Sequence, residues 1–295
     1  MTQRGIKGIQ VHEAPVLPVE RIHDLLRTRG RLVIGVAGGS ATGKSSAISR
    51  SLLQWAERQV FGGAPVQGAI LALDDFQLGR VFVDQSKSPY RWDDPDNFDI
   101  PRVKAALCDI REHGRANVPT FSLAKVARGE LQTFVAPQLT ILEGLYALYP
   151  DLIENIDYGI YVETPLAGRV VRRVFRFLYE HQIDKPLTAI SQCLTTVLAA
   201  HREKVVPQRL AADSVITLPY SFEETARRFS LSSFPPRPGR RIERRTPLAG
   251  DAAILLSSAD GGGLFEIEYH AQLVLSIPIS EELAAIARTV DWNER

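Results

Sequence analysis

Short apolar runs alternate with longer segments of helical periodicity over the first two thirds of the chain. Each run has the length of a buried strand, and the segments between the runs repeat apolar residues every three or four positions. The runs are RLVIGVA (31–37), AILALDDF (69–76), LTILEGLYAL (139–148), YGIYVET (158–164) and SVITLP (214–219). Strands that alternate with helices predict an α/β fold, with a mainly parallel sheet that helices flank on both faces.

The pattern changes from about residue 221. A proline- and arginine-rich stretch (234–247) precedes a segment that alternates like an antiparallel strand (264–279), and a helical segment (280–290) follows. We therefore expect an N-terminal leader and helix (1–30), a main domain (31–220) and a C-terminal β-containing extension (221–295) that adds strands to the same sheet.

Composition and charge narrow the function. The chain has 295 residues, with 35 Lys and Arg against 34 Asp and Glu, so its net charge of +1 creates no general attraction to nucleic acid or to a membrane. No apolar run reaches the roughly 20 residues of a membrane span, and Cys108 and Cys193 have no metal-ligand spacing. These features favour a cytoplasmic protein that acts on small molecules, and they leave a homo-oligomer open.

The segment GVAGGSATGKSS (35–46) follows the first apolar run and precedes a helical segment. Its residues 38–45 fit the pattern G-x-x-x-x-G-K-S/T, in which backbone N–H groups surround the phosphates of a nucleotide. Lys44 would neutralise phosphate charge and Ser45 would bind Mg²⁺ through its hydroxyl. The residues that we expect to bind ATP are Gly38, Gly39, Ser40, Ala41, Thr42, Gly43, Lys44, Ser45 and Ser46. The alternative is a glycine-rich turn that only joins a strand to a helix.

Acidic residues end two of the other apolar runs. Asp74 and Asp75 follow AILAL, and Glu143 follows LTIL. Ligands of open α/β sheets bind beyond the carboxyl ends of the strands, so Glu143 is a candidate for holding Mg²⁺ and one aspartate for accepting the proton of an attacking hydroxyl. A strand-end aspartate can also cap the next helix, and Glu143 can be a solvated loop residue.

Four arginines follow one face of a predicted helix, at positions i, i+3, i+4 and i+7. They are Arg169, Arg172, Arg173 and Arg176. Like charges on one stripe repel each other, so the stripe gains when a polyphosphate lies against it, as on the mobile lid of a kinase. The alternative is a solvated basic face. A second arginine cluster (237–245) lies in the proline-rich stretch and is interpreted as a solvated linker or an oligomer contact.

Together these motifs resemble the phosphoribulokinase and uridine kinase family, which has the P-loop NTPase fold. The phosphate loop, LDDF (73–76), WDDPDNFD (92–99), LEGLYAL (142–148) and VETPLAGRVVRRVFR (162–176) occur in the family's order. The resemblance implies ATP and Mg²⁺ as cofactors, an arginine-bearing lid, and catalysis by Lys44, Arg169 and Arg173, with Asp74 as the base. It also implies that Arg172 and Arg176 bind ATP.

The same resemblance implies an acceptor site. Asp93 would bind ribose hydroxyls, with Trp92, Phe98 and Phe121 also contacting the acceptor. The family's base-binding loop reads P-x-Y-x-F-x-x-H-x-R, whereas this chain has VPTFSLAKVAR (118–128), so Val126 replaces histidine. We expect a kinase for a primary hydroxyl, first of a nucleoside such as uridine or cytidine, and alternatively of a sugar, a sugar phosphate or a pantothenate-like acceptor. A nucleotide switch or a nucleic-acid-linked NTPase is the alternative from another class.

Overall fold

The computed structural model describes residues 10–12, 16–61, 63–122, 125–136, 138–180, 186–229, 231–259 and 262–295. The chain divides into two compact units, one of residues 1–163 with 199–218 and the other of residues 164–198 with 219–295. This division differs from the expected one, because the arginine-bearing segment 164–198 groups with the C-terminal extension.

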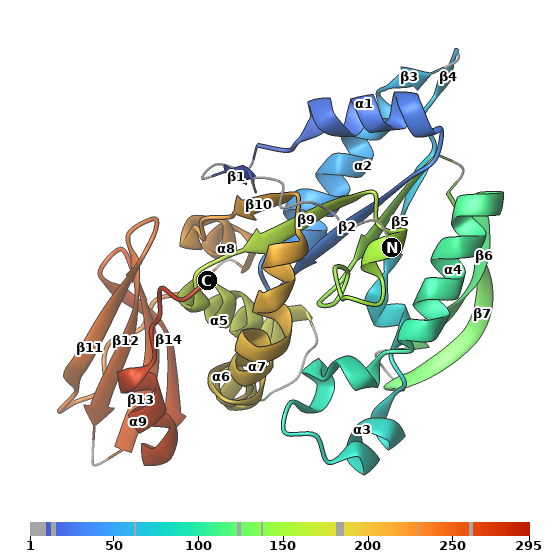
Figure 1. Cartoon of the computed structure of the whole chain (residues 1–295). Helices are drawn as coiled ribbons and strands as arrows, with labels where there is room; N and C mark the ends of the chain where they lie inside the picture. Colours follow the sequence, from blue (N-terminus) through green and yellow to red (C-terminus); the bar gives the residue numbers. More distant parts are fainter. Residues whose placement is uncertain are drawn as a thin grey trace. The chain divides into compact units, whose positions relative to one another are not determined.

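A six-stranded parallel sheet is the centre of the first unit (Figure 1). In sheet order its strands are β1 (Gln10–His12), β10 (Ser214–Thr217), β9 (Tyr158–Glu163), β2 (Leu32–Gly38), β8 (Leu139–Glu143) and β5 (Gly68–Ala72). Every neighbouring pair is parallel. The α/β fold and the five strands expected from the sequence are therefore confirmed.

Helices cover both faces of this sheet because successive strand residues point to opposite sides. Ile34 and Val36 pack with one helical layer, whereas Val33 and Ala37 pack with the other. The first layer consists of α1 (Val19–Arg29) and α2 (Arg50–Glu57), and the second contains α4 (Ile100–His113). The sheet's carboxyl edge, where the strands end, is left to the connecting loops.

Smaller elements complete the first unit. They are the hairpins β3 (Val60–Phe61) with β4 (Ala64–Pro65) and β6 (Arg115–Ser122) with β7 (Ala127–Val135), the helix α3 (Arg80–Ser86), and short 3₁₀ turns including η2 (Leu73–Phe76), η3 (Arg91–Asp93) and η4 (Pro95–Asn97). The helix α7 (Thr196–Ala200) lies at the division between the two units.

The second unit holds a separate four-stranded antiparallel sheet, β11 (Arg241–Leu248), β12 (Ala252–Ala259), β13 (Gly262–Tyr269) and β14 (Gln272–Ile279), in chain order. The expectation that the extension adds strands to the parallel sheet is therefore wrong for the described residues. Each strand pairs with its neighbour in sequence, and His270 and Ala271 make the tight turn between β13 and β14 with positive φ angles of 48° and 58°. Local hairpin pairing satisfies the strands without the first unit.

Helices pack on this second sheet in one core. They are α5 (Leu166–Phe175), α6 (Pro186–Leu194), α8 (Phe222–Phe229) and α9 (Glu281–Thr289). Val170 and Val174 of α5 share that core with Phe265 of β13 and with Trp292, whose side chain is fully buried. The helix that carries the arginine stripe is thus built into the same body as the C-terminal strands.

Candidate active site

The phosphate loop lies between β2 and a helical segment, as the motif requires. The π-helical turn η1 (Lys44–Ser49) leads directly into α2, and the Ala47 N–H donates to the Gly43 carbonyl at 2.9 Å. Gly43 has a φ of +93° and Ala41 a φ of +62°, a conformation that a residue with a side chain rarely adopts. Strained backbone of this kind concentrates at functional sites, and here it shapes a loop for backbone N–H donors.

Gly38 shows why a bare backbone is needed. A Cβ atom at this position would lie 2.1 Å from the Val162 carbonyl oxygen on the neighbouring strand β9, and the φ of Gly38 is +146°. Neither the space nor the dihedral angle accepts a side chain. Glycine therefore lets β2 leave the sheet and turn directly into the loop.

Lys44 and Thr42 are held inside the loop. The Lys44 ammonium donates to the Gly39 carbonyl at 3.0 Å, and the Thr42 hydroxyl donates to the same carbonyl at 2.9 Å. The Lys44 side chain is 8% exposed, so its charge is fixed beside the loop. A lysine in this position can neutralise the charge of phosphates that the loop binds.

Ser45 and Glu143 meet at the carboxyl edge. The Ser45 hydroxyl donates to Glu143 Oε1 at 2.9 Å, although the two residues lie on different strand connections. Sheet register explains the contact, because Glu143 pairs with Val36 of β2 on one side and with Ala72 of β5 on the other. A hydroxyl and a carboxylate are oxygen donors of the kind that Mg²⁺ prefers, so these two residues fit a magnesium ion whose other ligands are phosphate and water.

Asp74 and Asp75 share one 3₁₀ turn beyond β5 but differ in surroundings. Asp74 is exposed, and its Oδ1 accepts a long contact of 3.4 Å from Gln77. Asp75 is half-buried and accepts the Phe121 N–H of the β6 hairpin at 3.3 Å. Burial is the main cause that raises the pKa of Asp75, partly offset by that hydrogen bond. Asp74 is thus the aspartate open to an incoming molecule.

The segment predicted to bind the acceptor is ordered by internal contacts. The Tyr146 hydroxyl donates to the Asp93 carbonyl, and the Phe98 ring meets the Tyr146 ring edge-on at 5.4 Å. Phe98 is 3% exposed and belongs to the core, whereas Trp92 is half-buried. A direct role of Asp93, Trp92 and Phe98 in acceptor binding stays a prediction, to which the structure adds a packing role for Phe98.

Asp94 belongs to the same segment and caps a turn within it. Its carboxylate accepts the Ser88 hydroxyl and, at 2.9 Å, the Asp96 N–H, so it caps the turn η4. The side chain therefore has a local structural role.

The hairpin β6–β7 adds a residue that the sequence analysis did not single out. Arg128 donates to Asp99 Oδ2 at 3.1 Å and to the Phe76 carbonyl at 3.3 Å. It thereby links the hairpin that carries Phe121 to the turn that carries Asp74. Its place as the last residue of the P-x-Y-x-F-x-x-H-x-R pattern was the available signal. Leu123, from the same loop, lies outside the described residues.

The four arginines of the stripe lie in the second unit, on α5 and at the start of the turn that follows it. Their surroundings differ, since Arg169 is 3% exposed and Arg176 is exposed. Arg172 lies over the Tyr220 ring at 5.0 Å, and Arg173 donates to Gln192 Oε1 at 3.2 Å. The stripe is thus graded from buried to exposed. Its approach to the phosphate loop stays a prediction.

The second arginine cluster proves to be structural. Arg240 pairs with the fully buried Glu266 at 2.7 Å, and Arg245 pairs with Glu268 at 3.0 Å. Arg244 donates to the Ala287 carbonyl at 3.2 Å. The interpretation of residues 237–245 as a linker is wrong from Arg241 on, because β11 begins there, and Arg240 and Arg244 bind partners within the second unit. An oligomer contact of this cluster stays a prediction.

Among the described residues, none of the helices is both long and apolar enough to cross a membrane. In the same residues no group of three or more His, Cys, Asp or Glu side chains gathers to hold a metal.

Comparisons with known proteins identify relatives of residues 33–219, a range that includes the arginine-bearing segment 164–198 of the second unit. The sequence profile of the Phosphoribulokinase / Uridine kinase family matches residues 33–219. A uridine kinase of Macrococcus caseolyticus is 30% identical over 189 residues, which covers 62% of this chain and 86% of that protein. A uridine kinase of Lactobacillus helveticus is 27% identical over 190 residues, with 63% and 85% covered. The family match ends before the four-stranded sheet begins.

One solved structure is similar in both sequence and fold. A proposed fructose transport system kinase from Silicibacter sp. TM1040 aligns with a TM-score of 0.53 and 26% identity, over 64% of this chain and 90% of that one. Its fold agrees with the parallel sheet and flanking helices described above.

Proposed function

Because the chain belongs to the phosphoribulokinase and uridine kinase family of P-loop kinases, we propose that it transfers the γ-phosphate of ATP to a primary hydroxyl of a small molecule, first of all a nucleoside such as uridine or cytidine. The observation that carries the proposal is the meeting of Ser45 with Glu143 beside the exposed Asp74 turn. Three neighbouring strands, β2, β8 and β5, bring these groups to one edge.

Each group has a task in this reaction. The phosphate loop binds the triphosphate through backbone N–H groups, and Lys44 neutralises charge as the bond to the γ-phosphorus breaks. Asp74 accepts the proton of the acceptor hydroxyl while the oxygen of that hydroxyl bonds to the γ-phosphorus, and ADP leaves. Mg²⁺, when bound by Ser45 and Glu143, supplies charge neutralisation on the phosphates.

The lid arginines complete the proposal. Arg169 and Arg173 would stabilise charge on the transferred group, while Arg172 and Arg176 would bind ATP. Their common helix shares a core with the C-terminal strands, so any closing motion would carry those strands along.

A sugar acceptor is the second candidate. The similar solved structure is of a proposed fructose transport system kinase, and the loop 118–128 lacks the histidine of the base-binding pattern. A base that loses a hydrogen-bond partner is bound less selectively, which favours an acceptor with no pyrimidine.

Turnover with a panel of acceptors tests the proposal. ADP release and the phosphorylated product are measured with nucleosides, pentoses and hexoses, sugar phosphates and pantothenate. Asp74→Asn should lower kcat for the best acceptor by roughly 10²–10⁴-fold, since it removes the base. Asp75→Asn is the matched control and should retain most of the activity. ATP hydrolysis that no acceptor stimulates and that Asp74→Asn leaves unchanged would contradict the kinase, and stimulation by RNA or DNA would favour an NTPase.

A further inference from the structure

Tyr146 is a buried tyrosine whose hydroxyl bonds to a distant part of the first unit. Its side chain is 0% exposed, and its hydroxyl donates to the Asp93 carbonyl, 53 positions away in the sequence. The rings of Phe98 and Tyr149 meet the Tyr146 ring edge-on, with centroids at 5.4 Å and 5.7 Å. The ring is therefore held in place, and its hydroxyl joins two chain segments.

The backbone on both sides of Tyr146 is fixed by one buried amide. The side chain of Gln208, which is 4% exposed, donates to the Leu145 carbonyl at 2.8 Å. The same side chain accepts the Leu148 N–H at 3.0 Å. A buried polar group that has both a donor and an acceptor satisfied specifies one backbone conformation. Tyr146 is thus presented from a rigid loop.

This loop begins at the carboxyl edge of the sheet. Glu143, the carboxylate proposed to hold Mg²⁺, ends β8 three residues before Tyr146. A Cβ atom on Gly144 would lie 2.4 Å from the Leu73 Cβ, at the start of the η2 turn. Only a residue without a side chain allows this close approach, which keeps the loop against the turn that carries Asp74.

Residues 91–99, the acceptor segment, are bonded to two parts of the same edge. The Asp99 N–H donates to the Phe76 carbonyl at 3.0 Å, which joins the segment to the η2 turn of the exposed Asp74. The Tyr146 hydroxyl joins the segment to the loop that follows β8. These contacts together fix where the acceptor segment lies relative to the proposed base and the proposed metal site.

The Tyr146 hydroxyl is a lasting hydrogen-bond donor. Burial is the main cause that raises the pKa of Tyr146 far above its ordinary value of 10.0, and the carboxylates of Asp93 and Asp94 raise it further. A backbone carbonyl can only accept a hydrogen bond, so the protonated hydroxyl is the partner that this contact needs. The contact is therefore independent of pH near neutrality.

We propose that Tyr146 is a positioning residue for phosphoryl transfer, which holds the acceptor segment in the place from which the acceptor meets Asp74 and the phosphates. The inference rests on the proposed function, in which this segment binds the acceptor. Phenylalanine at this position would keep the ring and lose only the hydroxyl contact. Binding of the acceptor would then have to order a looser segment, which weakens that binding and leaves the binding of ATP unchanged.

Steady-state kinetics of Tyr146→Phe with the best acceptor of the panel test this role. We expect the KM for the acceptor to rise about tenfold, with kcat changed less than about threefold and the KM for ATP unchanged. Tyr158→Phe is the matched control, because Tyr158 is 5% exposed and its hydroxyl shares a hydrogen bond of 2.6 Å with the Ser214 hydroxyl. Both variants lose a buried tyrosine hydroxyl and should melt at lower temperature, but only Tyr146→Phe should change the KM for the acceptor.

Hydrogen exchange of the ligand-free proteins gives a readout that needs no acceptor. The Asn97 and Asp99 N–H groups, which are hydrogen-bonded at 3.1 Å and 3.0 Å, should exchange faster in Tyr146→Phe than in Tyr158→Phe. If Tyr146→Phe is too unstable to assay, the wild-type rates decide. Exchange of these two groups as slow as that of β8 supports a fixed segment, and fast exchange contradicts it.

The outcomes separate this inference from the proposed function. An unchanged KM for the acceptor in Tyr146→Phe, or equal changes in both tyrosine variants, would overturn the inference, while loss of turnover in Asp74→Asn would still support the kinase. If the wild-type protein phosphorylates no acceptor, the proposed function fails. The exchange rates then decide alone whether Tyr146 holds the segment, and equal rates in the two variants would show that it does not.

Discussion

The two ends of the six-stranded sheet carry the same kinds of polar side chain in opposite situations. At the carboxyl end, Asp74 is exposed, and the Glu143 carboxylate accepts a hydrogen bond from the Ser45 hydroxyl. At the amino end, the Asp157 side chain is 2% exposed, and its carboxylate accepts hydrogen bonds from two arginines and a backbone N–H. A buried carboxylate with several partners in the chain holds the fold together, whereas an exposed one with a single long contact, such as Asp74, is available for chemistry.

Strand geometry produces this difference. Parallel strands end together, so the loops that follow them meet at one edge and leave room for a ligand. At the other edge α1 and α4 end where β2 and β9 begin, so arginines of their last turns reach the aspartate before β9. Substitutions of Asp74 or Lys44 at the carboxyl end should therefore act mainly on catalysis, and substitutions of Asp157 mainly on stability.

Lys44→Ala should have a larger effect than any substitution at the amino end. Removing this fixed ammonium from the phosphate loop should lower kcat/KM for ATP by roughly 10²–10³-fold, as expected for one charge-stabilising donor. The rise in melting temperature that an ATP analogue causes should also be lost. Lys87→Ala, in an exposed turn, is the control. A variant at Lys44 that keeps both the analogue-induced rise and the turnover would show that the loop does not hold the phosphates.

Gly38→Ala should follow, because it disturbs both fold and loop. The new Cβ would meet the Val162 carbonyl at 2.1 Å, so the backbone must shift, and we expect a loss of about 3 kcal/mol in the free energy of unfolding. Gly63→Ala isolates the dihedral cost, since Gly63 has a φ of +83° and open space around it. Urea unfolding of both variants gives the comparison. Equal losses would mean that the clash with β9 is not what requires glycine.

Local patterns made the carboxyl end predictable from the sequence. The phosphate loop is a stretch of eight residues, and Asp74 and Glu143 directly end apolar runs, so the residue order alone places them at the strand ends. The amino end was missed because its contacts join distant residues: Arg29 and Asp157 are 128 positions apart. The linker interpretation of the C-terminal arginines was wrong for the same reason. Arg240 meets Glu266 only once β11, β12 and β13 have paired.

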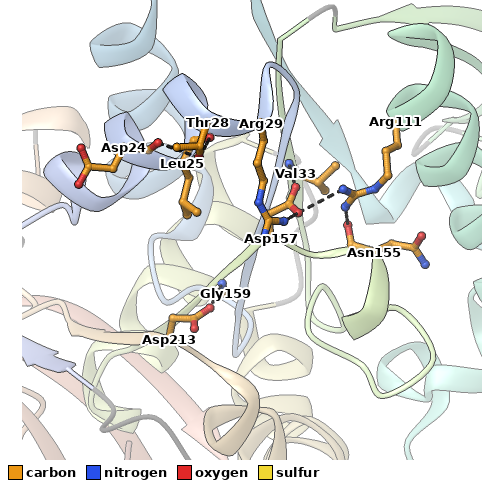
Figure 2. Close-up of polar contacts among 10 residues, drawn as sticks. All are labelled: Asp24, Leu25, Thr28, Arg29, Val33, Arg111, Asn155, Asp157, Gly159 and Asp213. Atoms are coloured by element: carbon orange, nitrogen blue, oxygen red, sulfur yellow. Dashed lines mark hydrogen bonds and ion pairs between the residues drawn. The ribbon is translucent and has the colours of Figure 1, made fainter. Parts of the chain in front are cut away.

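Asp157→Asn should cost about 2 kcal/mol of unfolding free energy, since it leaves two arginines without their shared charge. Asp213→Asn is the matched control. Asp213 also precedes a strand and accepts a backbone N–H, that of Gly159 at 2.8 Å (Figure 2). Both asparagines can still accept the N–H, so the difference between the variants reports the arginine pairs. Higher salt should narrow that difference. Equal destabilisation would show that the arginines add nothing to the backbone contact.

Asp75→Asn should have the smallest effect, and its sign should depend on pH. Burial raises the pKa of Asp75 above its ordinary value of 3.8, so the folded chain holds that proton more tightly than the unfolded chain does. The free energy of unfolding therefore falls as pH rises from 3.8 through the raised pKa. Asparagine has no proton to lose in this pH range and can still accept a hydrogen bond from the Phe121 N–H.

Relative to the wild type, the variant should consequently be more stable at pH 7 than at pH 4, by less than about 1 kcal/mol. Urea unfolding at the two pH values measures this change. If Asp75→Asn instead loses stability as pH rises, the ionised Asp75 has a stabilising partner. The contrast between a structural and a chemical aspartate within this turn would then be wrong.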